Sequence, residues 1–518
     1  MVDDAQSEFA RRFASAIGLS QFLGDRSGQL KFLLILFIAT ASIRSIYTMP
    51  IEFGGDALKK WMYVQQFDGS GEALLTDHHT MRWSVTMTGV LVRLAFGDEP
   101  ATYYVAPLIV FALAFTVLIR IARTAMPPWM LLPFGLILFI EPMMFRASSQ
   151  FQPIVYGFCY VTLSYAFLSR WLETSRFFFF LLSVLFFFFA YGAKIPYGYF
   201  LPGLLLFLWR ERGGRMVGIY SSIFAIFVAI EVVVFNAASD KFLLLGRASK
   251  LVETHTPGGG AWRFSYFDYI LMWRELPVFD IALVALALGF SLYCLSVPAS
   301  REIPKAVVAF SLMSFGYIVI NMTLIVDFDT MLTPQGPMVK YLAVSMPFFC
   351  FIACGWIAIA IESAGPKPWQ TKAKFAVYLA TSVLAIQFVS SGTKPTYTYS
   401  RLTYPAPKMF CYRVNGHYQK LANWLKSGNV IYTKRLACAR AFCILLRPYL
   451  DETQLVYEKV DESTFSIGLG NNSPDSKCAA TWYGFSQFNA VGKYKKLQNV
   501  PSLSAAAVPL CDPKCFNY

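Results

Sequence analysis

Four polar side chains that could carry chemistry lie in the segment between the first two apolar runs of the chain. Asp56 follows a Gly-Gly pair and opens a stretch with helical spacing, and "DHHTMRWSV" then supplies His78, His79 and Arg82. A carboxylate can accept a proton from a hydroxyl, and a guanidinium can bind phosphate through two parallel hydrogen bonds. If residues 78–82 are helical, the histidines and Arg82 share a face. The pattern favours a reactive loop, although a solvated loop in which Asp56 only caps a helix would contain the same residues.

The chain around this segment is strongly apolar. Hydrophobic residues make up 56% of it, aromatic residues 17% and charged residues only 15%, whereas soluble domains average about 45–50% apolar and 25% charged. Apolar runs of about 20 residues, enough to cross a bilayer as a helix, recur along the sequence. We predict eleven spans, at approximately 31–49, 102–119, 129–145, 153–169, 177–193, 195–209, 216–236, 278–297, 306–326, 339–362 and 375–391.

The distribution of Lys and Arg predicts which way these spans run. With the N-terminus inside, the cytoplasmic segments hold 16 basic residues in 74, a density roughly twofold higher than on the other face. Residues 1–30 are then a cytoplasmic segment without the apolar region of a signal peptide, followed by a transmembrane domain over 31–391. The loops 50–101 and 237–277 lie outside. We therefore expect a multi-pass protein of the cytoplasmic (inner) membrane.

An odd number of spans also places residues 392–518 outside the cytoplasm. Short strands are predicted there at the alternating apolar patches "NVIYT", "FCILL", "TQLVYEKV" and "TFSIGLG". Together with the helical stretch "GHYQKLANWLKS" they predict a small α/β domain. Paired thiols persist in oxidising compartments, and this segment holds an even set of cysteines that favours disulfides over zinc ligands. The disulfide candidates are Cys411, Cys438, Cys443, Cys478, Cys511 and Cys515.

The charge of this predicted domain indicates its partners. It carries 16 Lys and Arg against 7 Asp and Glu, and so contributes +9 of the chain's +14. A basic surface on the outer side of a membrane favours phospholipid headgroups or an anionic glycan, although it also serves solubility alone. We expect membrane lipids as partners and no nucleic acid.

The order of these features resembles the GT-C superfamily of integral-membrane glycosyltransferases, in particular the protein O-mannosyltransferase and aminoarabinose transferase branch. "GGDA" with Asp56 resembles the early acidic motif of the first outer loop in that family, and "DHHTMRWSVTMTGVLVRLAFGDEP" resembles its polar patch before a juxtamembrane helix. "YGAKIPYGYF" is similar to its Lys-containing turn, and "PQGPMVKYLAVSM" to its basic-Tyr motif at Lys340 and Tyr341. The resemblance covers residues 31–362. It implies an all-α polytopic fold of about eleven transmembrane helices, with the extracytoplasmic α/β domain appended.

The resemblance also implies an activity. Members of this branch use polyprenyl-phosphate sugars, so the chain is expected to be a hexosyl- or pentosyltransferase whose acceptor is a glycan, lipid or protein of the cell envelope. Asp56 is the expected general base in an inverting transfer. The expected substrate- and phosphate-binding residues are His78, His79, Arg82, Arg146, Lys194, Lys340 and Tyr341. Gln150 and Gln152 stand where the family often has a carboxylate. This difference weakens the expectation of a second catalytic acid or a metal at that loop.

Two other classes of function remain open from the sequence. A polymerase or ligase of lipid-linked polysaccharides would use the late outer loop 237–277, which contains His255, Arg263 and Arg274. A transporter of lipid-linked substrates would place charges in mid-span and show inverted repeats. No cofactor is firmly predicted. A divalent metal has weak support, because Asp56, Asp77, His78 and His79 would form a site only if the loop folds back on itself.

Overall fold

The computed structural model describes the helical part of the chain in nine ranges and the remainder as short strands. The helical ranges are 26–48, 56–67, 81–97, 102–237, 246–247, 278–296, 303–323, 342–364 and 367–390. Apart from β1 at residues 47–48, the described strands lie between residues 397 and 484.

A helix lies in each of the eleven ranges predicted as spans. These helices are α3 (Arg26–Ile46), α6 (Thr102–Ala125), α7 (Pro128–Ile140), α8 (Pro142–Ser149), α9 (Pro153–Thr174), α10 (Phe177–Ala193), α11 (Leu201–Arg212), α12 (Gly214–Ala237), α15 (Val278–Ser296), α16 (Lys305–Thr323), α18 (Met346–Ser363) and α19 (Lys367–Ser390). Two shorter helices, α4 (Asp56–Gln66) and α5 (Trp83–Phe96), occupy the segment between α3 and α6.

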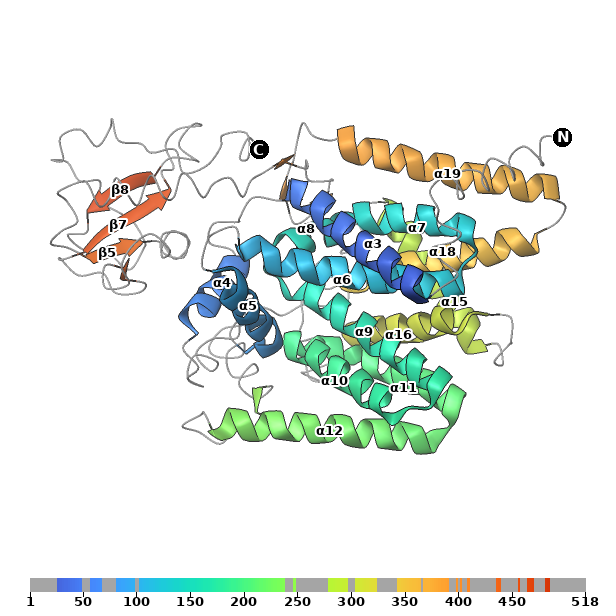
Figure 1. Ribbon diagram of the computed structural model, residues 1–518, viewed down its shortest axis with the longest axis horizontal. Coiled ribbons are helices and arrows are strands. Elements are labelled where there is room, and N and C mark those ends of the chain that lie inside the picture. The colour runs from blue at the N-terminus through green and yellow to red at the C-terminus, as the bar shows by residue number, and fades with distance from the viewer. Residues whose placement is uncertain are drawn as a thin grey trace.

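Length and apolar composition identify the chain as a multi-pass membrane protein. Four described helices can cross a bilayer by these criteria: α6, α12, α18 and the part of α3 from Gly28 to Ser45. Counting α7 and α8 as one bent span raises the number to five. Figure 1 shows α12 along one edge of the bundle and α19 along the opposite edge. Both helices expose large apolar side chains, among them Val233 and Phe375 at 67% each, as expected of surfaces that face lipid.

The predicted span at 129–145 is wrong as a single helix. The chain bends by 62° between α7 and α8, because Glu141 and Pro142 interrupt the helix. A proline removes a backbone donor and disfavours helical geometry in the residue before it. The Glu141 carboxylate then caps α8 by accepting from the backbone N–H groups of Met143 at 3.0 Å and Met144 at 2.6 Å.

The chain also breaks between α10 and α11, where the sequence predicts two helices rather than one. Lys194 has extended backbone angles, with φ −163° and ψ 127°, and a 3₁₀ helix, η2 (Ile195–Phe200), leads into α11. Tyr197 of η2 lies against Gly157 of α9, so closely that no Cβ would fit at that glycine. The break therefore holds Lys194 at a helix end packed on the core.

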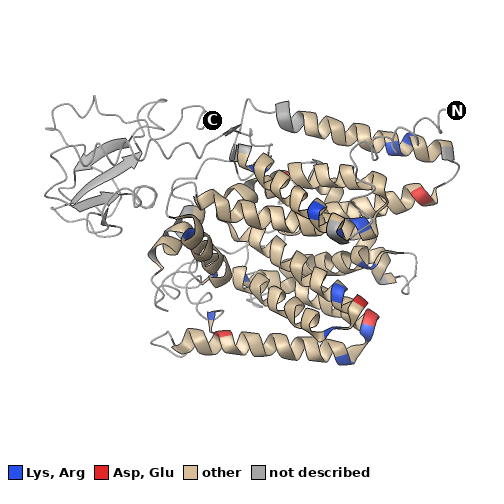
Figure 2. Cartoon of the chain, viewed as in Figure 1, with Lys and Arg blue, Asp and Glu red and all other residues tan. Residues whose placement is uncertain are grey.

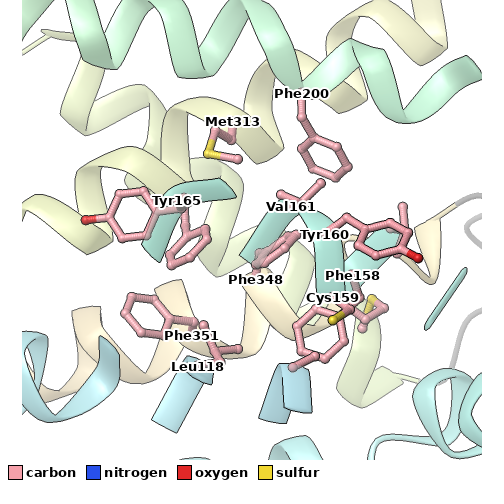
Figure 3. Packing of buried hydrophobic residues seen from close by; sticks show 14 of the residues in the cluster. Leu118, Phe158, Cys159, Tyr160, Val161, Tyr165, Phe200, Met313, Phe348 and Phe351 are labelled. Carbon is pink, nitrogen blue, oxygen red and sulfur yellow. The ribbon is translucent and has the colours of Figure 1, made fainter. Parts of the chain in front are cut away.

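Helix α9 runs through the centre of the bundle, and aromatic side chains pack around it (Figure 3). The ring of Phe348 from α18 lies 5.8 Å from that of Phe158 on α9 and 4.9 Å from that of Phe310 on α16. Phe200 of η2 adds a contact to Phe348 at 5.7 Å. Edge-to-face and offset pairs of this kind stabilise an interior beyond simple burial, so the helices that flank the candidate site stand on a rigid core.

Charged residues gather toward one end of the helices, and the helix bodies are almost free of them (Figure 2). Segments that the sequence assigns to the cytoplasmic side meet there. Lys305 pairs with Glu211, and Arg212 donates to the carbonyl of Leu172 at 2.9 Å. Lys374 pairs with Glu362 at 2.9 Å. The predicted inner loops thus share one end of the structure; which membrane face that end adjoins stays a prediction.

The described strands form three small sheets. β1 (Tyr47–Thr48), directly after α3, pairs antiparallel with β4 (Lys408–Met409), and β2 (Tyr397–Thr398) pairs antiparallel with β3 (Arg401–Leu402). The four-stranded sheet has the order β6-β5-β7-β8, built from β6 (Leu455–Val456), β5 (Arg435–Cys438), β7 (Thr464–Leu469) and β8 (Ala480–Gly484). β5 is parallel to both of its neighbours, and β8 is antiparallel to β7.

Two of the apolar patches predicted as strands, "TQLVYEKV" and "TFSIGLG", contain β6 and β7. The predicted helix "GHYQKLANWLKS" and the patches "NVIYT" and "FCILL" lie outside the described residues. Of the six disulfide candidates only Cys438 falls in a described strand, so the pairing of the tail cysteines stays a prediction. The four cysteines of the helices, Cys159, Cys294, Cys350 and Cys354, are buried and free, as expected of packing residues.

Candidate functional site

Asp56 is the first residue of α4, where the sequence predicts a helix to start. The helix packs against the rest of the bundle through the side chain of Trp61, which is 1% exposed. The Trp61 ring lies 5.4 Å from Phe151, at the junction of α8 and α9, and 6.0 Å from Tyr103 of α6. The Tyr103 hydroxyl in turn accepts from the backbone N–H of Phe151 at 3.1 Å. A buried aromatic contact therefore sets the position of α4 against the helix that carries Arg146.

Helix α4 also packs on α5, and Arg93 joins the two. Its Nη1 donates to the carbonyl oxygens of Val64 at 2.7 Å and Gln65 at 2.8 Å. These carbonyls belong to the last turn of α4, where backbone acceptors have no partner within the helix. Gly89 of α5 lies against Val64 and Phe151, and a Cβ at Gly89 would meet them at 2.7 and 2.6 Å. The two helices form one unit, with a charged side chain at the end of α4 where the helix dipole favours a cation.

The start of α5 is bound to α9 and α10. The Ser84 hydroxyl donates to the carbonyl of Phe189 at 2.8 Å, and the hydroxyls of Thr88 and Tyr160 lie 2.7 Å apart. Trp83 packs on Phe189, with 5.5 Å between ring centroids. All these contacts lie on the first turns of α5. Its N-terminal end is therefore held against the C-terminal half of α10.

This packing brings Arg82 toward Lys194. Arg82 directly precedes α5, and its carbonyl accepts from the N–H groups of Val85 and Thr86 at 2.9 and 3.1 Å. Lys194 follows the last residue of α10. The indole of Trp83 lies against Gly192, where a Cβ would meet it at 2.5 Å. Arg82 and Lys194 are thus close in sequence to the contact between Trp83 and Gly192.

A shared face for Arg82 with His78 and His79 requires residues 78–82 to be helical, and Arg82 does not meet that condition. Its φ of −84° and ψ of 57° lie outside the helical region, and α5 begins only at Trp83. The physical reason is that Arg82 acts as the N-cap residue, and such residues have non-helical backbone angles while their carbonyl accepts the first helical bond.

Arg247, which the sequence analysis did not select, binds the segments next to Arg82 and Lys194. Arg247 is 2% exposed, and its Nη1 donates to the carbonyls of Met81 at 3.0 Å and Gly192 at 2.8 Å. Its Nη2 donates to the carbonyl of Tyr191 at 2.8 Å. The guanidinium Nε lies 2.6 Å from the carboxylate of Glu231 on α12. One side chain therefore joins the chain before α5, the end of α10, and α12.

Arg44, which lies inside the first predicted span, is fully buried. Its Nε donates to the Ser148 hydroxyl at 2.8 Å and its Nη1 to the Phe139 carbonyl at 3.1 Å. The guanidinium also lies 4.1 Å from the ring centroid of Phe145, a cation–π geometry. Arg44 thus fastens α3 to the corner between α7 and α8. Arg146 lies on α8, two residues before Ser148.

The remaining predicted site residues lie outside the described part of the chain. These are His78, His79, Lys340 and Tyr341, together with Asp77. Of the elements that carry the described candidates, α4, which begins at Asp56, contacts α5, which follows Arg82, and α5 contacts the end of α10 before Lys194. Within the described residues, no group of three or more His, Cys, Asp or Glu is placed to hold a metal ion.

Comparisons with known proteins give no sequence match, since no family model and no curated protein matches the chain. Solved structures do match. The chain is similar to a crystal structure of ArnT from Cupriavidus metallidurans in the apo state, with a TM-score of 0.43 and 15% identity over 81% of this chain and 75% of that one.

The chain is also similar to the oligosaccharyltransferase of Archaeoglobus fulgidus. The apo form matches with a TM-score of 0.42 and 10% identity over 82% of this chain and 64% of that one. The form tethered to an acceptor peptide with the NVT sequon matches with a TM-score of 0.40, 11% identity and coverages of 82% and 63%. The chain thus spans less than two thirds of the length of this enzyme.

The residues that position the site carry only weak signals in the sequence. Arg247 follows Gly246, which has a φ of +52° and lies so close to α12 that a Cβ would meet the Cα of Val232 at 3.1 Å. Glu231 is an acidic residue within an apolar run, and such residues are costly in a membrane unless they are paired. The position of Glu231 therefore indicates that it needs a partner. It does not indicate which residue the partner is.

Proposed function

We propose that the protein is a membrane glycosyltransferase that moves a sugar from a polyprenyl-phosphate donor to a hydroxyl of a cell-envelope glycan, lipid or protein. The reaction takes place on the outer face of the cytoplasmic membrane. The observation that carries the proposal is the position of α5, which contacts both the helix that begins at Asp56 and the end of α10 before Lys194. We propose on this basis that Asp56, Arg82 and Lys194 belong to one site.

Asp56 acts as the general base in this proposal. The Asp56 carboxylate takes the proton of the acceptor hydroxyl, and the hydroxyl oxygen forms a bond to the anomeric carbon of the sugar. The bond from that carbon to the phosphate oxygen breaks on the opposite face, and its electron pair leaves with the polyprenyl phosphate. Configuration at the anomeric carbon is therefore inverted.

The leaving phosphate requires positive charge nearby. Arg82 and Lys194 are the first candidates, because their elements touch at Trp83 and Gly192. Arg146 is the next, since Trp61 of α4 packs on Phe151 just after α8. Preorganised cations in a partly dehydrated site stabilise developing negative charge strongly. His78, His79, Lys340 and Tyr341 are proposed to bind the phosphate or the acceptor.

The test is transfer by purified protein in lipid nanodiscs, with polyprenyl-phosphate sugars of several types as donors. Transfer by the wild type and by Asp56→Asn is compared. Asn preserves the shape and the capping ability of Asp but cannot accept the proton. We expect transfer to fall by ~10²–10⁴-fold, the usual contribution of a positioned base, while donor binding stays near that of the wild type.

A matched control changes a carboxylate that has no part in the proposal. Glu173 forms an exposed ion pair with Arg170, so Glu173→Gln should transfer sugar like the wild type. An Asp56→Asn protein that is as active as the wild type would rule out Asp56 as the base. Failure of every polyprenyl-phosphate sugar to serve the wild type would rule out the donor class.

A further inference from the structure

We infer that Arg247 and Glu231 form a positioning clamp, which sets the place of Arg82 and of the helix that begins at Asp56 relative to Lys194. The inference rests on the proposed function, because it assigns a role to two residues outside the reacting groups. It starts from the burial of an ionic pair at the corner where α5, α10 and α12 meet.

Three of the five N–H donors of Arg247 bind backbone carbonyls. Its Nη1 serves two backbone carbonyls, those of Met81 and Gly192, and its Nη2 serves that of Tyr191. Its Nε faces Glu231 at 2.6 Å, and its guanidinium carbon lies 4.7 Å from the Tyr191 ring centroid. A planar guanidinium can satisfy several acceptors in fixed directions, whereas a lysine ammonium is a point charge that cannot span them.

The carbonyls that Arg247 bridges belong to segments next to the proposed phosphate-binding residues. Met81 directly precedes Arg82, and Gly192 lies two residues before Lys194. Met81 and Arg247 are 166 positions apart in the sequence. A distant part of the chain therefore determines the separation of the two cations, in addition to the contact of Trp83 with Gly192.

The clamp also affects the position of α4, which begins at Asp56, because α5 contacts α4. Arg93 and Gly89 join α5 to the last turn of α4, so a shift in the start of α5 displaces α4 as well. Small misplacements matter in such a site, since a displacement of ~1 Å in reacting groups can cost ~10²-fold in rate. We assign Arg247 and Glu231 as positioning residues, not catalytic ones.

Glu231 holds the guanidinium in place from α12. Its carboxylate is 5% exposed and the Arg247 side chain 2% exposed. A buried charge without its partner is strongly unfavourable, so the two are expected to act as a unit. Glycine suits position 246, because a φ of +52° is strained for other residues and a Cβ there would meet the Cα of Val232 at 3.1 Å.

The test compares Arg247→Lys and Glu231→Gln with the wild type, all as full-length protein in nanodiscs. Arg247→Lys retains the charge opposite Glu231 but cannot bridge the three carbonyls. We expect its kcat for transfer to fall by ~10–100-fold, with a smaller change in KM for the donor. Glu231→Gln should lower kcat in the same direction. Arg170→Gln, at an exposed pair, is the matched control and should leave kcat unchanged.

Amide hydrogen exchange supplies a readout that does not depend on activity. Both clamp variants should exchange faster than the wild type at residues 82–89 and 188–194, with the core of α9 unchanged. Wild-type kcat in Arg247→Lys would overturn the inference. Faster exchange throughout the protein would do so as well, because Arg247 would then serve general stability. If the wild type transfers no sugar, the proposed function fails, whereas exchange confined to the two helix ends would still support the clamp.

Discussion

The indole of Trp83 lies against the backbone of Gly192, with no room for a methyl group between them. A Cβ at Gly192 would meet ring atoms of Trp83 at 2.5 and 2.6 Å. The contact joins the first residue of α5 to the next-to-last residue of α10. Any side chain at Gly192 therefore pushes the start of α5, and Arg82 with it, away from Lys194.

Gly192→Ala should destabilise the protein and lower sugar transfer. Alanine gains about 0.5–1 kcal/mol of helix propensity over glycine, but overpacking a close contact costs about 1–3 kcal/mol. We expect a net loss of up to ~2 kcal/mol, measured as a lower melting temperature in detergent. Gly218→Ala on α12 is the control, because nothing lies within 4 Å of its added Cβ. The smaller Trp83→Phe ring should relieve the loss; purely additive effects of the two changes would contradict this account.

Arg93→Gln should weaken the attachment of α4 to α5. The substitution removes a charged donor from the carbonyls of Val64 and Gln65, and hydrogen bonds to charged groups contribute about 1.5–3 kcal/mol. Amide exchange in α4 should accelerate, and transfer should fall because α4 begins at Asp56. Arg170→Gln, at an exposed ion pair, should change neither. Unchanged exchange in α4 would mean that Trp61 alone holds this helix.

Reporter fusions test the predicted orientation. A reporter that is active only outside the cytoplasm should work when fused after residue 395, and one that is active only inside should work after residue 212. The density of Lys and Arg in the short loops drives this expectation. The opposite pattern would place α4, α5 and the proposed site on the cytoplasmic face, and the polyprenyl-phosphate donor would then have to be presented there.

Thiol counting tests the tail. Three disulfides are expected among its six cysteines, each worth about 2–4 kcal/mol through restriction of the unfolded chain. Protein purified without reductant should therefore show no reactive tail thiols after denaturation, once the four buried free cysteines of the helices are allowed for. Four or more additional free thiols would exclude the predicted set and favour a reduced tail.

Hydrophobic runs and breaks in the sequence determined where the helices lie. Each predicted span range contains a helix, α4 begins at Asp56, and the chain breaks at Lys194, because these features depend on nearby residues. The bend at Glu141 was missed, although its Glu-Pro pair is visible in the sequence. Polar residue types also sufficed to select Asp56, Arg82, Arg146 and Lys194 as candidates.

Only the tertiary structure decided how these residues are positioned. Arg44 is recognisable in the sequence as a charged residue within an apolar run. Its partners Ser148 and Phe139 are not, because they lie about a hundred positions further along the chain. No sequence feature selected Arg247. It binds the carbonyls of Met81 and Tyr191 and pairs with Glu231. Backbone carbonyls are the same in every residue, so no sequence pattern marks which ones a distant arginine will bind. That choice is made by long-range packing, when the helices bring their ends together.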